Sequence, residues 1–117
     1  MNNGYLQADV FTLEHSAATE VGRFLRREMG LQSAAAHASW TGDRLTVNLT
    51  EALTPIGQAA VLAEGGDDLL ETAYETLYAL HRSHLQSLIS RVMGQPVRES
   101  ALRMDASSGS FILTFAF

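Results

Sequence analysis

Leu53-Thr54-Pro55, Gly65-Gly66 and Gly94 follow one another at spacings that divide the second half of the chain into two helices. Threonine before proline is typical of a helix start, because proline at the first helical position lacks only an N–H that would have no partner within the helix. The glycine pair predicts the end of this short helix. We then predict a long helix that Asp67-Asp68 caps and Gly94 ends.

The long helix presents one broad apolar side, which predicts that it is the main helix of the core. The residues of this side recur every three or four positions and are Leu70, Ala73, Tyr74, Leu77, Leu80, His81, His84, Leu85, Leu88 and Val92. At 1.5 Å per residue the helix is about 40 Å long, so part of it is expected to project or to serve an interface.

Apolar alternation after Gly94 predicts a closing β-hairpin. Its first strand runs from Val97 to Met104, residues 105–109 form the connection, and the last strand is FILTFAF at residues 111–117. Both faces of the last strand carry little charge, which indicates a central strand or one buried at a subunit contact. On the less apolar face, Ile112 and Ala116 are candidates for such an interaction.

Helical spacing also predicts a first helix from an N-cap at Thr12 to Gly30, and residues 1–10 are expected to be disordered or loosely packed. Alternation on either side of Thr41-Gly42-Asp43 then predicts a hairpin of residues 34–40 and 44–50. We therefore expect residues 1–117 to form one α+β domain. It is a two-layer sandwich of an antiparallel sheet of two hairpins packed by two longer helices and one short helix, in the order α-β-β-α-α-β-β.

The composition excludes several functions. The chain has no cysteine and no lysine, which rules out disulfides, thiolate chemistry, Schiff bases and a P-loop lysine. The net charge of −5 is the wrong sign for a protein that binds phosphate backbones, so RNA and DNA are not expected as partners. No apolar run is long enough to span a bilayer, and a cytoplasmic location is expected.

His81 and His84 are the candidate metal ligands, because residues three apart on a helix share a face. Further ligands, such as His15, His37 or Glu75, would have to come from other parts of the fold. The other interpretations are a neutral, hydrogen-bonded histidine at a helix seam, which we favour, or a surface position. We therefore expect no metal and no cofactor.

Two charged groups are further candidates. Arg23 and Arg27, with Arg26 between them, could bind an anion or a partner, although Glu20 and Glu28 favour a solvated face. Asp67 and Asp68 could form a carboxylate pair, but capping explains them more simply. No catalytic residue is predicted.

From Leu45 to its end the chain resembles the MpsC-type small bacterial domains, long known only as a domain of unknown function. The resemblance rests on the strand before Leu53-Thr54-Pro55, the long helix that ends at Gly94, and the hairpin with Asp105 near its turn. Two segments depart from the family pattern. Gly30-Leu31-Gln32-Ser33 replaces a Gly-Arg-Gly-Pro segment, and the acidic residue expected after Leu-Thr-Pro is missing around Gly57-Gln58.

The resemblance implies a link to a sodium-translocating, membrane-potential-generating system and to bicarbonate uptake. We therefore expect a non-enzymatic interaction or regulatory module that is accessory to a membrane transport protein. The apolar residues on both faces of the last strand and on more than one stripe of the long helix separately predict a homodimer. The alternative is a small-molecule- or metal-dependent enzyme with a site around His81 and His84.

Overall fold

The protein is described by a computed structural model. It covers the backbone of residues 3–32, 35–63, 65–105 and 107–117, and their side chains apart from those of residues 3–9 and Asp67. The elements follow in the predicted order. They are α1 (Asn3–Met29), β1 (Ala35–Thr41), β2 (Arg44–Thr50), α2 (Pro55–Leu62), α3 (Gly66–Met93), β3 (Glu99–Asp105) and β4 (Ser110–Ala116).

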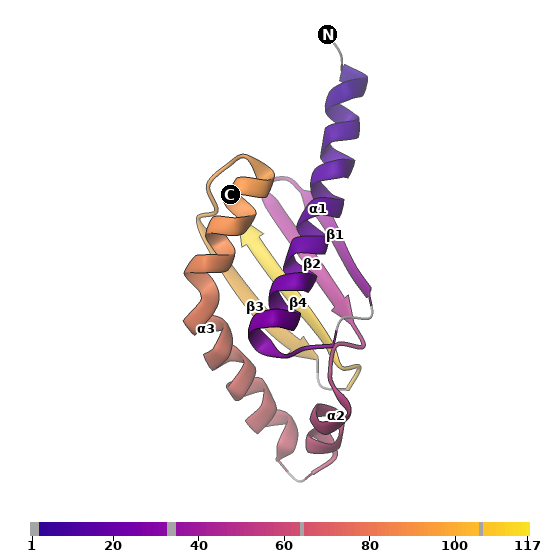
Figure 1. Ribbon diagram of the computed structural model, residues 1–117, viewed down its shortest axis with the longest axis vertical. Coiled ribbons are helices and arrows are strands. Elements are labelled where there is room, and N and C mark those ends of the chain that lie inside the picture. The colour runs from indigo at the N-terminus through magenta and orange to yellow at the C-terminus, as the bar shows by residue number, and fades with distance from the viewer. Residues whose placement is uncertain (1–2, 33–34, 64, 106) are drawn as a thin grey trace.

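The four strands form one antiparallel sheet in the order β1-β2-β4-β3. α1 and α3 lie side by side over one face of this sheet, which confirms the predicted two-layer α+β fold (Figure 1). β4 is a central strand of the sheet, which is one of the two positions that the sequence predicted for it.

The core lies between this sheet face and the two long helices. Alternate residues of β2 and β4 point into it, as the period of two in a strand requires. The fully buried large side chains are Phe24, Leu25, Leu31, Leu45, Leu49, Leu53, Tyr78, Leu85, Ile89, Phe111, Leu113 and Phe115. Trp40 is half-buried, and its ring centroid lies 5.0 Å from that of Phe117 at the same end of the sheet.

The predicted start of the first helix is wrong. α1 begins at Asn3, so Thr12 lies inside the helix and is no N-cap. Residues 6–8, Leu-Gln-Ala, are good helix formers and no proline precedes Thr12, so nothing in the local sequence stops the helix there.

The predicted cap of the long helix is also wrong. The N-cap of α3 is Gly65, in the left-handed region at φ 72°, so neither Asp67 nor Asp68 takes the N-cap position. The tight turn from α2 decides this start. A Cβ at Gly66 would overlap the carbonyl oxygen of Ala60, so only glycine allows the two helices to approach so closely.

The buried stripe of α3 is narrower than the predicted side and is rotated around the helix. It consists of Tyr74, Tyr78, Leu85, Ile89 and Met93. Leu80, Ala73 and His84, which the prediction placed on the core side, are exposed, Leu80 by 74%. α1 packs along only one side of α3, so the second apolar column remains at the surface.

The molecule measures 57 × 23 × 23 Å. It is elongated because α1 begins beyond one end of the sheet, whereas α2 and the first turns of α3 lie beyond the other (Figure 1). The sheet face opposite the helices carries half-buried side chains on its two central strands, among them Thr46, Asn48, Ile112 and Thr114.

Candidate functional site

Three connections meet at the end of the sheet where β2 leads into α2. The amide N–H of Gln32, after α1, donates to the carbonyl oxygen of Ala52 at 2.8 Å. The amide of Ala52 in turn donates to the carbonyl oxygen of Gly109, in the β3–β4 turn, at 2.9 Å. We call this junction the corner. The corner joins three segments that are far apart in the sequence. The segments around Ala52 and Gly109 belong to the family resemblance, and the segment that contains Gln32 departs from the family pattern.

The Leu-Thr-Pro segment forms the helix start within the corner. Thr54 is the N-cap of α2, and its Oγ1 accepts a hydrogen bond from the amide of Gly57 at 3.2 Å. Leu53 is buried beneath the β3–β4 turn. The amide Nε2 of Gln58 donates to the carbonyl oxygen of Leu53 at 3.1 Å. An ionised carboxylate cannot donate this bond, so Gln58 has a different role from an acid at this place.

A hollow of about 440 Å³ opens at the corner. Its lining combines polar side chains with an apolar floor and consists of Gln32, Glu51, Leu53, Gln58, Val61, Leu62, Ser107, Ser108 and Gly109. Glu51 has φ 51° and is the one non-glycine residue with positive φ in the described part of the chain. Such conformations cost free energy and concentrate at functional sites, so Glu51 marks the hollow as the candidate site.

Asp105 adds a second carboxylate beside this hollow. The Ser107 hydroxyl donates to Oδ1 of Asp105 at 2.7 Å, and the Ser107 amide donates to the same atom at 3.1 Å. The hydroxyl bond is the main cause that lowers the pKa of Asp105 below its ordinary value. Asp105 therefore stays ionised, and with Glu51 it makes the corner acidic. The lining can hold a polar group through carboxylate, amide and hydroxyl oxygens.

The structure brings His81 and His84 together on one aromatic ring. Both imidazoles meet Phe24 edge to face, with centroid distances of 6.0 Å for His81 and 5.4 Å for His84. His81 is half-buried and His84 is exposed. Within the described residues, no group of three or more His, Asp or Glu side chains lies close enough to hold a metal ion. The packing on Phe24 supports a seam position for His81.

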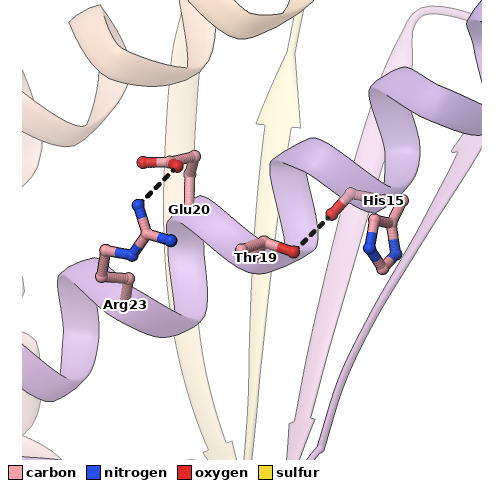
Figure 2. A network of polar contacts seen from close by, with 4 residues as sticks. All are labelled: His15, Thr19, Glu20 and Arg23. Carbon is pink, nitrogen blue, oxygen red and sulfur yellow. Dashed lines mark hydrogen bonds and ion pairs between the residues drawn. The ribbon is translucent and has the colours of Figure 1, made fainter.

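The three arginines of α1 have different surroundings. Arg23 pairs with Glu20 at 3.1 Å, and Thr19 donates to the carbonyl oxygen of His15 on the same helix (Figure 2). Arg27 pairs with its neighbour Glu28 at 3.5 Å. Arg23 and Arg26, but not Arg27, line a hollow between α1 and β1. The structure thus groups Arg23 with Arg26, and not with Arg27 as the sequence suggested.

Ile112 and Ala116 lie on the open face of the sheet, where the sequence placed them. Ile112 is half-buried and Ala116 is only 5% exposed. In the register of the sheet Ile112 stands between Asn48 and Arg103. The apolar surface that these residues offer is therefore small.

Asp68 lies in the first turn of α3, where it lines a second hollow with Glu71, Arg103 and Asp105. The side chain of Asp67 is outside the described residues, so the proposed carboxylate pair is not described either. This second hollow shares Ser107 with the corner.

Sequence reasoning missed two polar contacts that shape the fold. Glu14 accepts a hydrogen bond from the backbone N–H of Trp40 at 2.7 Å. Tyr78 donates its hydroxyl to Ser100 at 2.5 Å, and Gln86 donates to the same oxygen at 2.8 Å. Each contact had a sequence signal. Glu14 interrupts the apolar stripe of α1, and Ser100 takes an inward position of β3, so each polar group needs a partner.

These features define a small two-layer α+β domain with one open sheet face and a hollow at the corner. A comparison with protein-family models matches residues 11–117 to the family described as the Na⁺-translocating membrane potential-generating system, MpsC. The chain belongs to the MpsC family. Searches of curated proteins and of solved structures each found no match. Within the described residues, no helix is both long enough and apolar enough to cross a membrane.

Proposed function

We propose that this protein is a non-enzymatic cytoplasmic module that binds and regulates a membrane transport protein. The transport system is sodium-linked and moves ions or bicarbonate. The family description supports the link to a Na⁺-translocating membrane system. The protein acts as an accessory component, and the corner is the part that contacts the partner.

One observation carries this assignment. Three of the segments that carry the family resemblance or depart from it are hydrogen-bonded into one junction through Gln32, Ala52 and Gly109. Segments that are hydrogen-bonded to one another around a hollow provide a pre-formed binding surface, which reduces the entropy lost on association. The strained backbone of Glu51, which lines the hollow, also supports the corner as the binding surface.

The enzyme alternative has less support. It depends on His81 and His84, which lie on α3 against Phe24 and away from the segments of the corner. We therefore give the binding role to the corner and a packing role to His81.

Membrane capture tests this function. The tagged chain is incubated with detergent-solubilised membranes that contain a sodium-translocating system, and retained proteins are identified by mass spectrometry. We expect a transport protein to be retained. Glu51→Gln should reduce its recovery about tenfold, because a charged hydrogen-bond acceptor contributes about 1.5–3 kcal/mol.

Glu75→Gln is the matched control, since Glu75 is exposed on α3 and does not line the corner hollow. This variant should retain the transport protein as the parent does. If the parent chain retains no membrane transport protein, the proposed function is wrong. If Glu51→Gln and Glu75→Gln lower recovery equally, the contact with the partner does not lie at the corner.

A further inference from the structure

β1 is an outer strand of the sheet, so one of its edges does not pair with another strand. The N–H of Trp40 points away from β2, because it donates to Glu14 Oε2 at 2.7 Å. Backbone groups alternate in direction along an antiparallel strand, so the N–H and C=O groups of Ala38 and Ala36 point the same way. Within the described residues no hydrogen bond involves the outward groups of Ala36 and Ala38. These groups can pair with another strand.

The two edges of the sheet differ in charge. The other edge strand, β3, carries Glu99, Arg103 and Asp105, and such charges oppose pairing with a further strand. β1 has the sequence AAHASWT, in which His37 is the one titratable side chain. β1 is therefore the edge that is open to strand addition.

A basic hollow lies directly beside this edge. It has a volume of about 240 Å³ between α1 and β1, and His15, Arg23 and Arg26 line it together with Ala35 and Ala36. Arg23 is paired with Glu20, whereas Arg26 forms no ion pair with any described residue. The chain as a whole has a net charge of −5, so the two arginines of this hollow run against the overall charge.

We propose that the β1 edge binds an extended, acidic segment of a protein partner as a fifth strand. The segment pairs with the outward groups of Ala36 and Ala38, as in other cases of β-strand addition. Its carboxylates on the helix side lie in the hollow with Arg26, Arg23 and His15. Glu14 already shows a carboxylate bound to an outward N–H of this edge.

Charge decides between an acidic segment and a second copy of the chain. Two-fold pairing of β1 with itself would place two hollows lined by His15, Arg23 and Arg26 next to each other. Like charges so arranged repel, whereas the carboxylates of an acidic segment are attracted. The inference rests on the proposed function only in that it takes the partner to be a protein.

The test uses the isolated full chain and two synthetic seven-residue peptides. One alternates aspartate with valine, and the other alternates lysine with valine. Binding is followed by fluorescence anisotropy of the labelled peptide, and amide hydrogen exchange is followed at Ala36 and Ala38. We expect the aspartate peptide to bind and to slow exchange at both amides, and the lysine peptide not to bind.

Two substitutions address the two halves of the proposal. Arg26→Gln should weaken binding of the aspartate peptide at least about tenfold, as expected for a lost charge-assisted hydrogen bond. Arg27→Gln is the matched control, because Arg27 pairs with Glu28 and does not line the hollow. Ala38→Pro should abolish strand pairing, since it removes an outward N–H that the ladder to β2 does not use.

Three outcomes would overturn the inference. If the lysine peptide binds as tightly as the aspartate peptide, the edge does not select by charge. If Arg27→Gln weakens binding as much as Arg26→Gln does, the hollow does not bind the carboxylates. Inorganic phosphate is the third probe. If phosphate changes amide hydrogen exchange at the residues that line the hollow, while the aspartate peptide leaves exchange at Ala38 unchanged, the site binds small anions only. Peptide binding without membrane capture would overturn the proposed function alone, and capture without peptide binding would overturn this inference alone.

Discussion

Single polar residues decide much of the local structure. Gln58, Glu14 and Ser100 each occupy a position where an apolar or acidic residue would fit the surrounding pattern. Each forms a defined hydrogen bond, Gln58 to Leu53, Glu14 to Trp40 and Ser100 to Tyr78. These groups are exposed or half-buried, so each hydrogen bond contributes about 0.5–1.5 kcal/mol to the observed arrangement of the chain.

The phenol of Tyr78 makes stability depend on alkaline pH. Burial is the main cause that raises the pKa of Tyr78 above the ordinary 10.0, and the Ser100 bond and Arg82 oppose it in part. The folded protein therefore holds this proton more tightly than the unfolded chain. The resulting stability is fully present below about pH 10, the unfolded pKa, and is lost as pH rises through the folded pKa.

We expect the free energy of unfolding to fall above about pH 10 and to fall less steeply in Tyr78→Phe. At pH 7 this substitution should cost about 0.5–1.5 kcal/mol through the lost hydrogen bond. Urea unfolding at a series of pH values measures both effects. Tyr74 also has a raised pKa, so part of the alkaline loss should remain. If the free energy of unfolding of Tyr78→Phe falls with pH as steeply as that of the parent, Tyr78 does not cause the loss of stability at alkaline pH.

At the scale of elements, α3 shows that apolar spacing alone does not identify the buried side of a helix. Two adjacent columns of α3 are apolar, and only the column that contains Tyr78, Leu85 and Ile89 is fully buried. The position of α1 decides which column faces the core. Leu80 belongs to the other column and is exposed.

Leu85→Ala should destabilise the protein by about 2–5 kcal/mol, because it leaves a cavity between α3 and the rest of the core. Leu80→Ala is the matched control on the same helix and should change the free energy of unfolding by about 0.5 kcal/mol or less. Denaturant unfolding of the two variants gives both values. Equal effects would mean that the buried side of α3 has been assigned wrongly.

At the scale of the whole molecule, the exposed large apolar residues lie on all three helices, with Val10 and Phe11 on α1. Ile56 and Leu62 on α2, and Leu69 and Leu80 on α3, are each more than 70% exposed. α2 and the start of α3 form the end of the molecule that extends beyond the sheet (Figure 1). Exposed apolar surface of this kind often marks a contact between proteins.

We expect the chain to form a two-fold dimer through the long helix or the terminal hairpin, since symmetric dimers are the commonest oligomers. Light scattering at micromolar concentration should give the mass of a dimer. Leu69→Glu tests the helix and Ile112→Glu tests the hairpin, and one of them should give a monomer. A parent protein of monomer mass, or a dimer that both variants leave intact, would contradict this expectation.

The sequence alone was sufficient for the order of the elements and the two hairpins, whereas it left the last strand either central or buried at a subunit contact, and the sheet order β1-β2-β4-β3 made it central. The element order and the hairpins depend on local signals, such as Thr54-Pro55 at a helix start and strict alternation in residues 111–117. Such signals act between neighbours in the chain. They also identified the family resemblance and the positions where this chain departs from it.

Only the tertiary structure decided the start of α1, the cap of α3, the buried column of α3 and the grouping of Arg23 with Arg26. It also brought Gln32, Ala52 and Gly109 into one corner. Each of these depends on contacts between residues far apart in the chain. The spacing of residues within one element cannot determine them, because helix packing and loop closure choose among arrangements that the local sequence permits equally well.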